Sequence, residues 1–176
     1  GAGEGVSLFS SFAALLSLNL SGRYKGISQI ISWSALDEQQ HSDNGIALFK
    51  DLCKEDPLTE DDVNEIFEGF QQVVQNEYAF IDKIFENRSL VNITSFDLKQ
   101  YILYRANDRL RALGIDRSFL FDSDGANRIK DWFHPLMAGS TSTDFFAQSK
   151  DGSNYIAKPT QDFRSVNLKN LHLTLV

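Results

Sequence analysis

The chain has 176 residues, a formal net charge of −7, and 42% hydrophobic and 12% aromatic residues, which is the composition of a globular domain with a sizeable core. Its acidic balance and lack of clustered lysine and arginine exclude a nucleic-acid-binding surface, because phosphate binding needs such clusters. Apolar runs stay shorter than the roughly 18 residues of a membrane span, and the single cysteine fits a reducing, cytoplasmic location.

Helices are predicted over most of the first two-thirds of the chain, where proline is rare. Thr59 and Thr94 or Ser95 are typical N-caps, and glycine at 22 and 114 is typical of helix ends. The predicted helices are 4–18, 24–54, the segment after Thr59 to about 85, the segment after Thr94 or Ser95 to 113, and a short one at 126–133. We therefore expect a helical domain over 1–138 and an extended tail over 139–176.

One face of the second predicted helix combines apolar residues with metal-ligand types. Positions three and four apart share a helix face, and here they read Ile27, Ile31, Ser34, Glu38, His41, Gly45 and Leu48. Because the ends of this line are apolar, we expect its middle to be buried. A buried carboxylate is unfavourable unless a charge or a metal compensates it, so Glu38 and His41 are predicted to hold one ion together.

The first predicted helix brings a second carboxylate to the same place. Its line Glu4, Leu8, Phe12 and Leu15 again has a carboxylate on the expected core side. Glu4 lies 17 residues before Ser21, and Glu38 lies 17 residues after it. An antiparallel hairpin turning near Ser21 would put both carboxylates at one level, about 25 Å from the turn. Half of a ferritin-like di-metal ligand set would result, and iron or manganese suits such donors.

A Glu-x-x-His pair by itself is more often part of a solvated helix face than a metal site. Its position in an apolar line, matched by Glu4 at equal depth, favours the metal interpretation here. His134 and His172 have no such context and are predicted to be surface residues.

Five segments together resemble a known family in their order and spacing. They are EGVSLFSSFA (4–13), DEQQHS (37–42), NEYAFIDKIF (76–85), DLKQYILYRANDRLRALGI (97–115) and IKDWF (129–133). They resemble the carboxyl-terminal half of the small, radical-generating subunit of class I ribonucleotide reductase, over about residues 4–162. The resemblance implies an all-α, ferritin-like helical bundle without its amino-terminal helices, and a tail that binds the large subunit.

The resemblance also implies roles for single residues. Glu4, Glu38 and His41 would be ligands of one metal in a di-iron, iron/manganese or dimanganese centre shared with the missing amino-terminal half. Asp37 would hydrogen-bond the histidine of the other metal and join the radical path, and Tyr155 would relay the radical to the large subunit. The residues lining the radical pocket would be Leu8, Phe12 and Ser34. Family members usually place larger apolar residues at two of these pocket positions, and Leu8 and Ser34 depart from that.

The implied function is that of a ribonucleoside-diphosphate reductase small subunit, which generates and exports the radical for deoxyribonucleotide synthesis. It would be dimeric when complete, and inactive without the missing half and the large subunit. Two alternatives remain. One is a fragment of another ferritin-like di-metal oxidase, which the segment 97–115 and the tail disfavour. The other is a non-catalytic half-bundle that acts as an interaction module and binds no metal.

Overall fold

The structure is a computed structural model, and it describes residues 2–22, 24–90 and 92–139. In these ranges the regular secondary structure is entirely helical, apart from an isolated bridge between Leu90 and Ile93. The helices are α1 (Ala2–Val6), α2 (Phe9–Ser17), the 3-10 helix η1 (Leu18–Ser21), α3 (Lys25–Glu55), α4 (Glu60–Phe85), α5 (Ser95–Leu113) and α6 (Ser123–Gly139). The all-α class is therefore confirmed, whereas the predicted tail, with Tyr155 and His172, lies outside the described residues.

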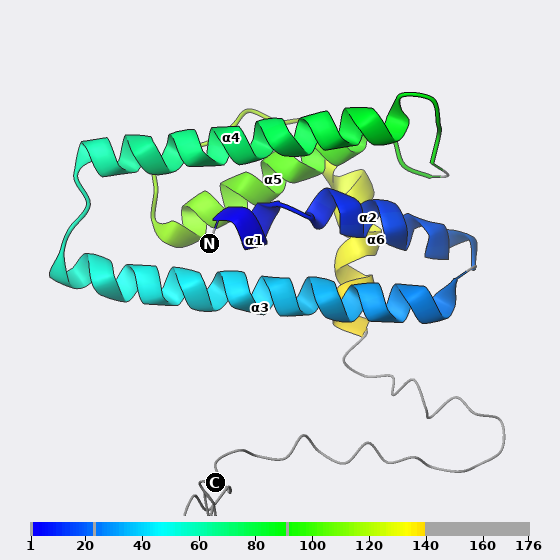
Figure 1. Ribbon diagram of the computed structural model, residues 1–176, viewed down its shortest axis with the longest axis horizontal. Helices are drawn as coiled ribbons and strands as arrows, with labels where there is room; N and C mark the ends of the chain where they lie inside the picture. Colours follow the sequence, from blue (N-terminus) through cyan, green and yellow to red (C-terminus); the bar gives the residue numbers. More distant parts are fainter. Residues whose placement is uncertain (1, 23, 91, 140–176) are drawn as a thin grey trace, which may run out of the picture. The chain divides into compact units, whose positions relative to one another are not determined.

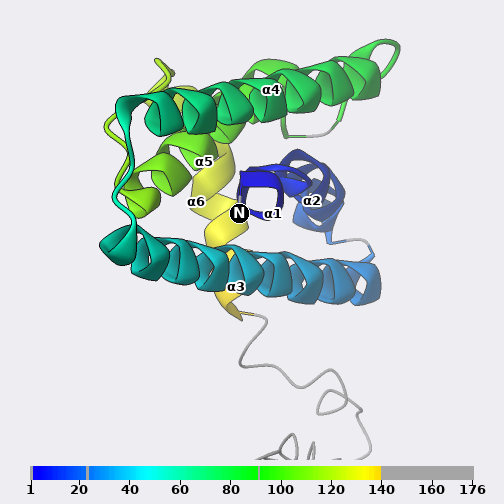
Figure 2. The ribbon, with the colours of Figure 1, turned by 60° about the vertical axis from the view of Figure 1, so that its left-hand side comes forward.

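The two longest helices, α3 and α4, lie on either side of the short helices α1 and α2. Figures 1 and 2 both show α1 and α2 between them, and the chain turns through η1 before it enters α3. Helix α5 packs against α4, α1 and α2, and α6 packs mainly against α5. The hairpin predicted for the first two helical segments is therefore present, with α2 and α3 in contact.

The boundaries of α4 and α5 follow from local hydrogen bonds that the sequence predicts. The Thr59 hydroxyl accepts from the Asp62 amide, and the Asp62 carboxylate accepts from the Thr59 amide, which forms a capping box. The Thr94 hydroxyl accepts from the Asp97 amide at the start of α5. Gly114, with φ of 84°, ends α5 in the left-handed conformation that glycine adopts at low cost.

The predicted single helix over 4–18 is wrong, because the chain breaks between α1 and α2. Leu8 has φ of 71°, a left-handed conformation that an α-helix cannot contain. The Glu77 carboxylate, from α4, accepts hydrogen bonds from the Leu8 amide at 3.3 Å and from the Ser10 hydroxyl. It satisfies donors at the start of α2, a role that a local side-chain cap usually has.

Helix α6 is longer than the helix predicted at 126–133. It begins at Ser123, beside the Asp122 carboxylate, which accepts from the Asp124 amide. It also continues past the exposed Pro135 to Gly139. The residues Ile129, Phe133 and Met137 are four apart and all buried, so their packing carries the helix through a proline that local rules would place at its end.

The buried face of α3 differs from the predicted one. The residues of α3 that are buried are Ser28, Ser32, Ala35, Ser42 and Ile46. On the predicted line, by contrast, Ile27 is 56% and Leu48 is 62% exposed, and His41 is exposed as well. The expectation that the middle of this line is buried is therefore wrong for this chain. Apart from Ile46, the buried side chains of α3 are small, and several large apolar ones, such as Ile27, Ile30 and Leu48, are exposed.

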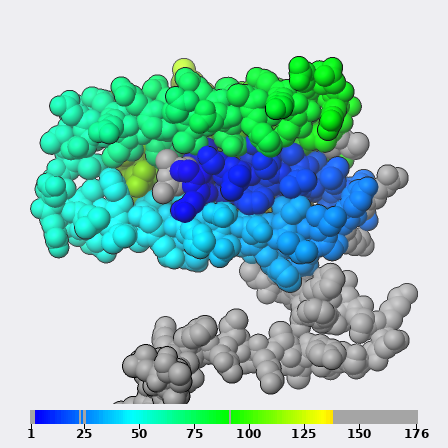
Figure 3. Space-filling model, in the orientation of Figure 1, coloured from blue at the N-terminus to red at the C-terminus, as the bar shows by residue number. Residues whose placement is uncertain are grey.

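The line on α1 and α2 behaves in the same way. Leu8 is 49% and Leu15 is 45% exposed, while Val6, Phe9 and Leu16 are fully buried and contribute to the core. Figure 3 shows α1 and α2 at the surface between α3 and α4, with a hollow on one side of them in which α5 is visible. That apolar groove, of about 370 Å³, is lined by α3, α4 and the end of α5. A second apolar groove, of about 410 Å³, lies between α2 and α4, and Leu90 is also part of its lining.

In the part of the chain that the structure describes, no helix combines the length and the apolar character needed to cross a membrane.

Candidate metal centre

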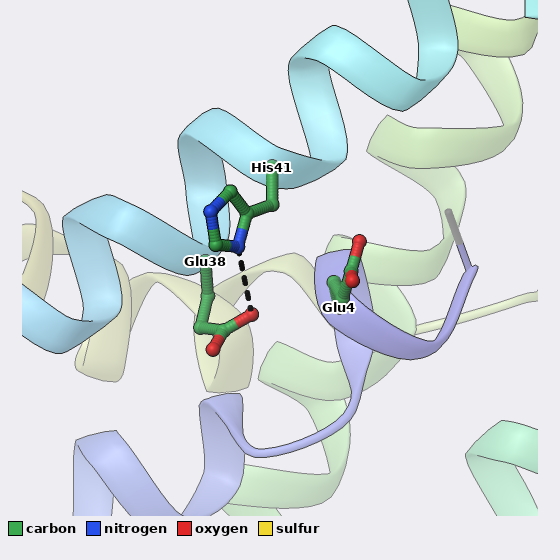
Figure 4. A group of neighbouring side chains, drawn as sticks. All are labelled: Glu4, Glu38 and His41. Atoms are coloured by element: carbon green, nitrogen blue, oxygen red, sulfur yellow. Dashed lines mark ion pairs between the residues drawn. The ribbon is translucent and has the colours of Figure 1, made fainter. Parts of the chain in front are cut away.

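Three potential metal ligands from two helices converge at one point. Glu4 comes from α1, and Glu38 and His41 come from successive turns of α3 (Figure 4). One ligand atom from each of the three side chains lies within 4.8 Å of the other two. The proximity predicted by counting residues around Ser21 is therefore confirmed, whereas metal binding stays a prediction.

His41 lies between two carboxylates on its own helix. Its Nδ1 is 3.8 Å from Glu38 Oε2, and its Nε2 is 3.7 Å from Asp37 Oδ2. The Glu38 side chain is 28% exposed, compared with 51% for His41 and 70% for Asp37. The group is therefore open to solvent on one side, and Asp37 is placed to interact with the imidazole.

The donor set fits an iron or manganese ion. Carboxylate oxygens and an imidazole nitrogen are ligands that both metals accept. Three such donors leave about half of an octahedral coordination shell for other groups. The open side of the site could admit further ligands, so an ion bound by this chain alone would have an incomplete protein shell.

Gly5 permits the close approach of α1 to α3 beside this group. A Cβ atom at Gly5 would lie 2.5 Å from Ser42 Oγ and 2.8 Å from Arg109 Cδ, distances that side chains do not adopt. The Ser42 hydroxyl is buried and has no hydrogen-bond partner within the described part of the chain. Only glycine therefore fits immediately after Glu4, and sequence reasoning missed this because the residue looked unremarkable in a helical pattern.

Two arginines on α5 are buried and hydrogen-bond to α3 close to the candidate ligands. Arg105 and Arg109 are 3% and 8% exposed. Arg109 Nη1 donates to Asp43 Oδ1 on α3, and Arg105 Nη1 donates to Gln39 Oε1 one turn away. Burial opposes ionisation of Asp43, but hydrogen bonds from Gln39 and Arg109 outweigh it and lower the pKa of this carboxyl. The sequence carried a signal for these residues, since Leu98, Tyr101, Arg105 and Arg109 share one face of a helix.

The residues implied in the radical pocket occupy mixed environments. Leu8 and Ser34 are exposed, and Phe12 is partly buried, with its ring 5.6 Å from that of Phe9 in an edge-on contact. Their role in lining a pocket stays a prediction. Tyr155, the implied radical relay, lies outside the described residues.

His134 is not the surface residue that the sequence predicts. Its ring is half-buried among the rings of Tyr101, Tyr104 and Phe133, and its Nε2 is 3.4 Å from the Tyr101 hydroxyl. Burial, and after it the positive charges of Arg105 and Lys130, lower the pKa of His134. The prediction failed because the longer α6 carries this residue onto α5. His172 lies outside the described residues.

Comparison with known proteins places these features in a family. The family described as "Ribonucleotide reductase, small chain" matches residues 2–124. The chain is 32% identical over 181 aligned residues to a probable ribonucleoside-diphosphate reductase small subunit of Invertebrate iridescent virus 6, covering 89% of this chain and 50% of that protein. A second such protein, from Invertebrate iridescent virus 3, is 33% identical, covering 81% of this chain and 38% of that protein.

A bacterial relative shows the same pattern at lower identity. Ribonucleoside-diphosphate reductase 1 subunit beta of Salmonella typhimurium is 27% identical, covering 73% of this chain and 36% of that protein. The chain thus spans half or less of the length of these relatives. The matched residues include α1 to α5 and all three converging ligands, and the helical bundle agrees with the ferritin-like fold that the resemblance implies. The chain therefore belongs to the ribonucleotide reductase small-chain family.

Proposed function

We propose that this chain supplies one ligand set of the dinuclear metal centre of a ribonucleotide reductase small subunit. The observation that supports this most strongly is the convergence of Glu4, Glu38 and His41, whose ligand atoms lie within 4.8 Å of one another. The other ligand set would come from an amino-terminal half of the subunit, whether that half belongs to the same polypeptide or to a separate one. The fraction of the relatives' length that this chain spans supports that division.

Each residue at the site has a distinct part in this proposal. Glu4 and Glu38 would bind one ion through carboxylate oxygens, and His41 would bind it through a ring nitrogen. Asp37 Oδ2 lies 3.7 Å from Nε2 of His41, which is longer than a hydrogen bond. A small approach on metal binding would let Asp37 accept a hydrogen bond from that nitrogen and fix the tautomer and orientation of the ring. Family resemblance gives Asp37 a further contact, to the histidine of the second metal. Two bound iron or manganese ions would supply the one-electron oxidation from which the subunit's radical arises.

The open face of the bundle supports a partner for this chain. Ile27 and Leu48 lie on the same line of α3 as Glu38 and His41 and are 56% and 62% exposed. Leu8 and Leu15, which follow Glu4 in the chain, are about half exposed. Burying such side chains is favourable by about 25 cal/mol per Å². Helices of an amino-terminal half that cover this face would bury the apolar side chains and enclose the metal together. Leu8, Phe12 and Ser34 would then line the radical pocket, and Tyr155 would pass the radical to the large subunit of a dimeric small subunit.

Metal binding by the full chain tests the proposal. Titration with Mn²⁺, followed by loss of the free-ion electron paramagnetic resonance signal, measures affinity. Glu38→Gln and His41→Gln should each weaken binding at least about 10-fold, because each removes one of few protein ligands. Glu55→Gln is the matched control, since it removes an exposed carboxylate from the same helix. Equal affinities of wild type, Glu38→Gln and Glu55→Gln would contradict the assignment.

The two alternatives give different results in the same system. A non-catalytic interaction module binds no metal either alone or with an amino-terminal half. Another ferritin-like oxidase binds metal but does not support ribonucleotide reduction when a large subunit is added. Metal binding together with ribonucleotide reduction, both measured on this chain combined with an amino-terminal half and a large subunit, distinguishes the proposed function from both alternatives.

A further inference from the structure

Arg105 is a buried charge that belongs to no ligand set. It lies on α5, a helix that carries none of the three candidate ligands, and only 3% of it is exposed. Burial lowers the pKa of its guanidinium, yet an arginine remains charged at neutral pH. A buried charge is costly unless hydrogen bonds compensate it. The groups that hydrogen-bond to Arg105 therefore indicate what this residue does.

The guanidinium of Arg105 connects the two helices that carry the ligands. Its Nε and Nη2 donate to the carbonyl oxygen of Gly5 at 3.2 and 2.7 Å, and its Nη1 donates to Gln39 Oε1 at 2.8 Å. Gly5 directly follows Glu4, and Gln39 directly follows Glu38. One planar group therefore holds α1 and α3 at the residues next to the two carboxylate ligands.

The contact with Gly5 also compensates the end of α1. The last carbonyls of a helix have no donor within the helix, and they favour a nearby positive charge. Arg105 supplies both a charge and two hydrogen bonds to such a carbonyl. Its guanidinium carbon further lies 3.7 Å from the centre of the Phe9 ring at the start of α2, in a cation–π contact. The group is thus fixed on three sides, and its geometry is rigid.

Such rigidity is what a shared ion requires of separate helices. Functional side chains must be held within about 0.5 Å of their productive positions. Glu4 and Glu38 come from different helices, so their separation depends on the contact between α1 and α3. The fit of Gly5 against Ser42 limits how close α1 can come, and the Arg105 bridge limits how far it can move away.

We propose that Arg105 is a positioning residue, which holds α1 against α3 so that Glu4, Glu38 and His41 can bind one divalent cation. The inference rests on the proposed function, because it concerns the same ligands. Residues that orient metal ligands typically contribute 10-fold to 100-fold in metal affinity, about the range expected here.

The test compares two buried residues of α5 in the full chain. Arg105→Met keeps much of the side-chain volume and removes all donors. Asn107→Leu is the matched control, since Asn107 is 8% exposed and exchanges two hydrogen bonds with the backbone of Phe119, which belongs to the loop after α5. Both variants should lose stability. Mn²⁺ affinity should fall at least about 10-fold in Arg105→Met and stay near wild type in Asn107→Leu.

Two more variants keep the test decisive. If Arg105→Met does not fold, Gln39→Met removes the bridge from Arg105 to α3, together with an exposed hydrogen bond from Gln39 to Asp43. It should still weaken Mn²⁺ binding relative to Asn107→Leu. Arg105→Lys retains the charge but cannot reproduce the planar, two-sided contact, so it should not restore the wild-type affinity. Full restoration by lysine would show that charge alone matters and would overturn the positioning role.

A metal-free readout separates this inference from the proposed function. Nitroxide labels on Glu4→Cys and Glu38→Cys, in a Cys53→Ser background, report the separation of α1 and α3 through dipolar broadening. Arg105→Met should reduce the broadening, and Asn107→Leu should leave it unchanged. If the wild-type chain binds no Mn²⁺ either alone or with an amino-terminal half, the proposed function fails, and the broadening still tests whether Arg105 holds α1 against α3. Unchanged broadening and unchanged affinity in Arg105→Met would overturn the inference.

Discussion

Ser10 donates a hydrogen bond to Glu77, a buried carboxylate 67 residues later in the chain, and the same carboxylate accepts from the Leu8 amide. The contact joins α4 to the start of α2, at the break that follows the helix of Glu4. A distant carboxylate therefore takes the place of a local cap, and the direction in which α2 continues from α1 depends on it.

Replacing Glu77 by leucine should destabilise the chain by about 2 kcal/mol, because buried donors at the start of α2 lose their acceptor. Urea unfolding followed by circular dichroism measures the change. Glu68→Leu is the control, since Glu68 is exposed on the same helix. Equal stability of the two variants would show that the carboxylate of Glu77 contributes nothing beyond its apolar stem.

Replacing Gly5 by alanine should also destabilise the chain, by about 1–3 kcal/mol, because the new methyl group would overlap Ser42 and Arg109. Gly69→Ala should instead be stabilising by about 0.5–1 kcal/mol, since Gly69 lies inside α4 with no atom within 4 Å of an added Cβ. Thermal unfolding of both variants checks the pair. Stabilisation by both substitutions would mean that α1 does not approach α3 as closely as described.

The pH dependence of stability should include a contribution from His134. Its folded-state pKa is lowered by burial, so the unfolded chain takes up a proton near the ordinary value of about 6.5 while the folded chain still excludes it. The unfolded state then binds more protons, and stability falls as the pH drops through that value toward the folded-state pKa. His134→Phe should flatten this part of the curve in urea unfolding between about pH 7.5 and 5. Parallel curves for wild type and variant would contradict the burial of this ring.

The isolated chain should self-associate through its open apolar face. Ile27 and Leu48 are 56% and 62% exposed on the same face as the candidate ligands, and exposed apolar patches of this kind drive association. Ile27→Lys combined with Leu48→Lys should shift the sedimentation velocity profile toward monomer. Leu120→Lys, at a leucine that is 98% exposed outside this face, should not. A wild-type chain that sediments as a monomer at micromolar concentration would disprove the prediction.

Features set by neighbouring residues could be predicted from the sequence. Thr59 and Thr94 cap the helices that follow them, because a side-chain cap acts within three residues. The meeting of Glu4 with Glu38 followed from equal counts on either side of Ser21, because the rise per residue of a helix is constant. The identity of the family followed from motifs in these same segments.

Features set by distant residues could not be predicted in this way. The break at Leu8 depends on Glu77, which no local pattern connects to it. The apolar line through Glu38 indicated a buried face, but periodicity cannot say which element covers a face or whether that element is in the chain. Arg105 was missed for a related reason, since an arginine in a helix is normally solvated, and only its contacts with Gly5 and Gln39 give it a role.

The most direct test of the central claim is the metal content of the chain assembled with an amino-terminal half of a small subunit. Atomic emission analysis after equilibrium dialysis counts the manganese or iron bound per complex. We expect two ions for the wild-type chain, and one fewer for both Glu38→Ala and His41→Ala, because each variant removes a ligand of the same ion. Full metal content in both variants would contradict the assignment of Glu4, Glu38 and His41 as a ligand set.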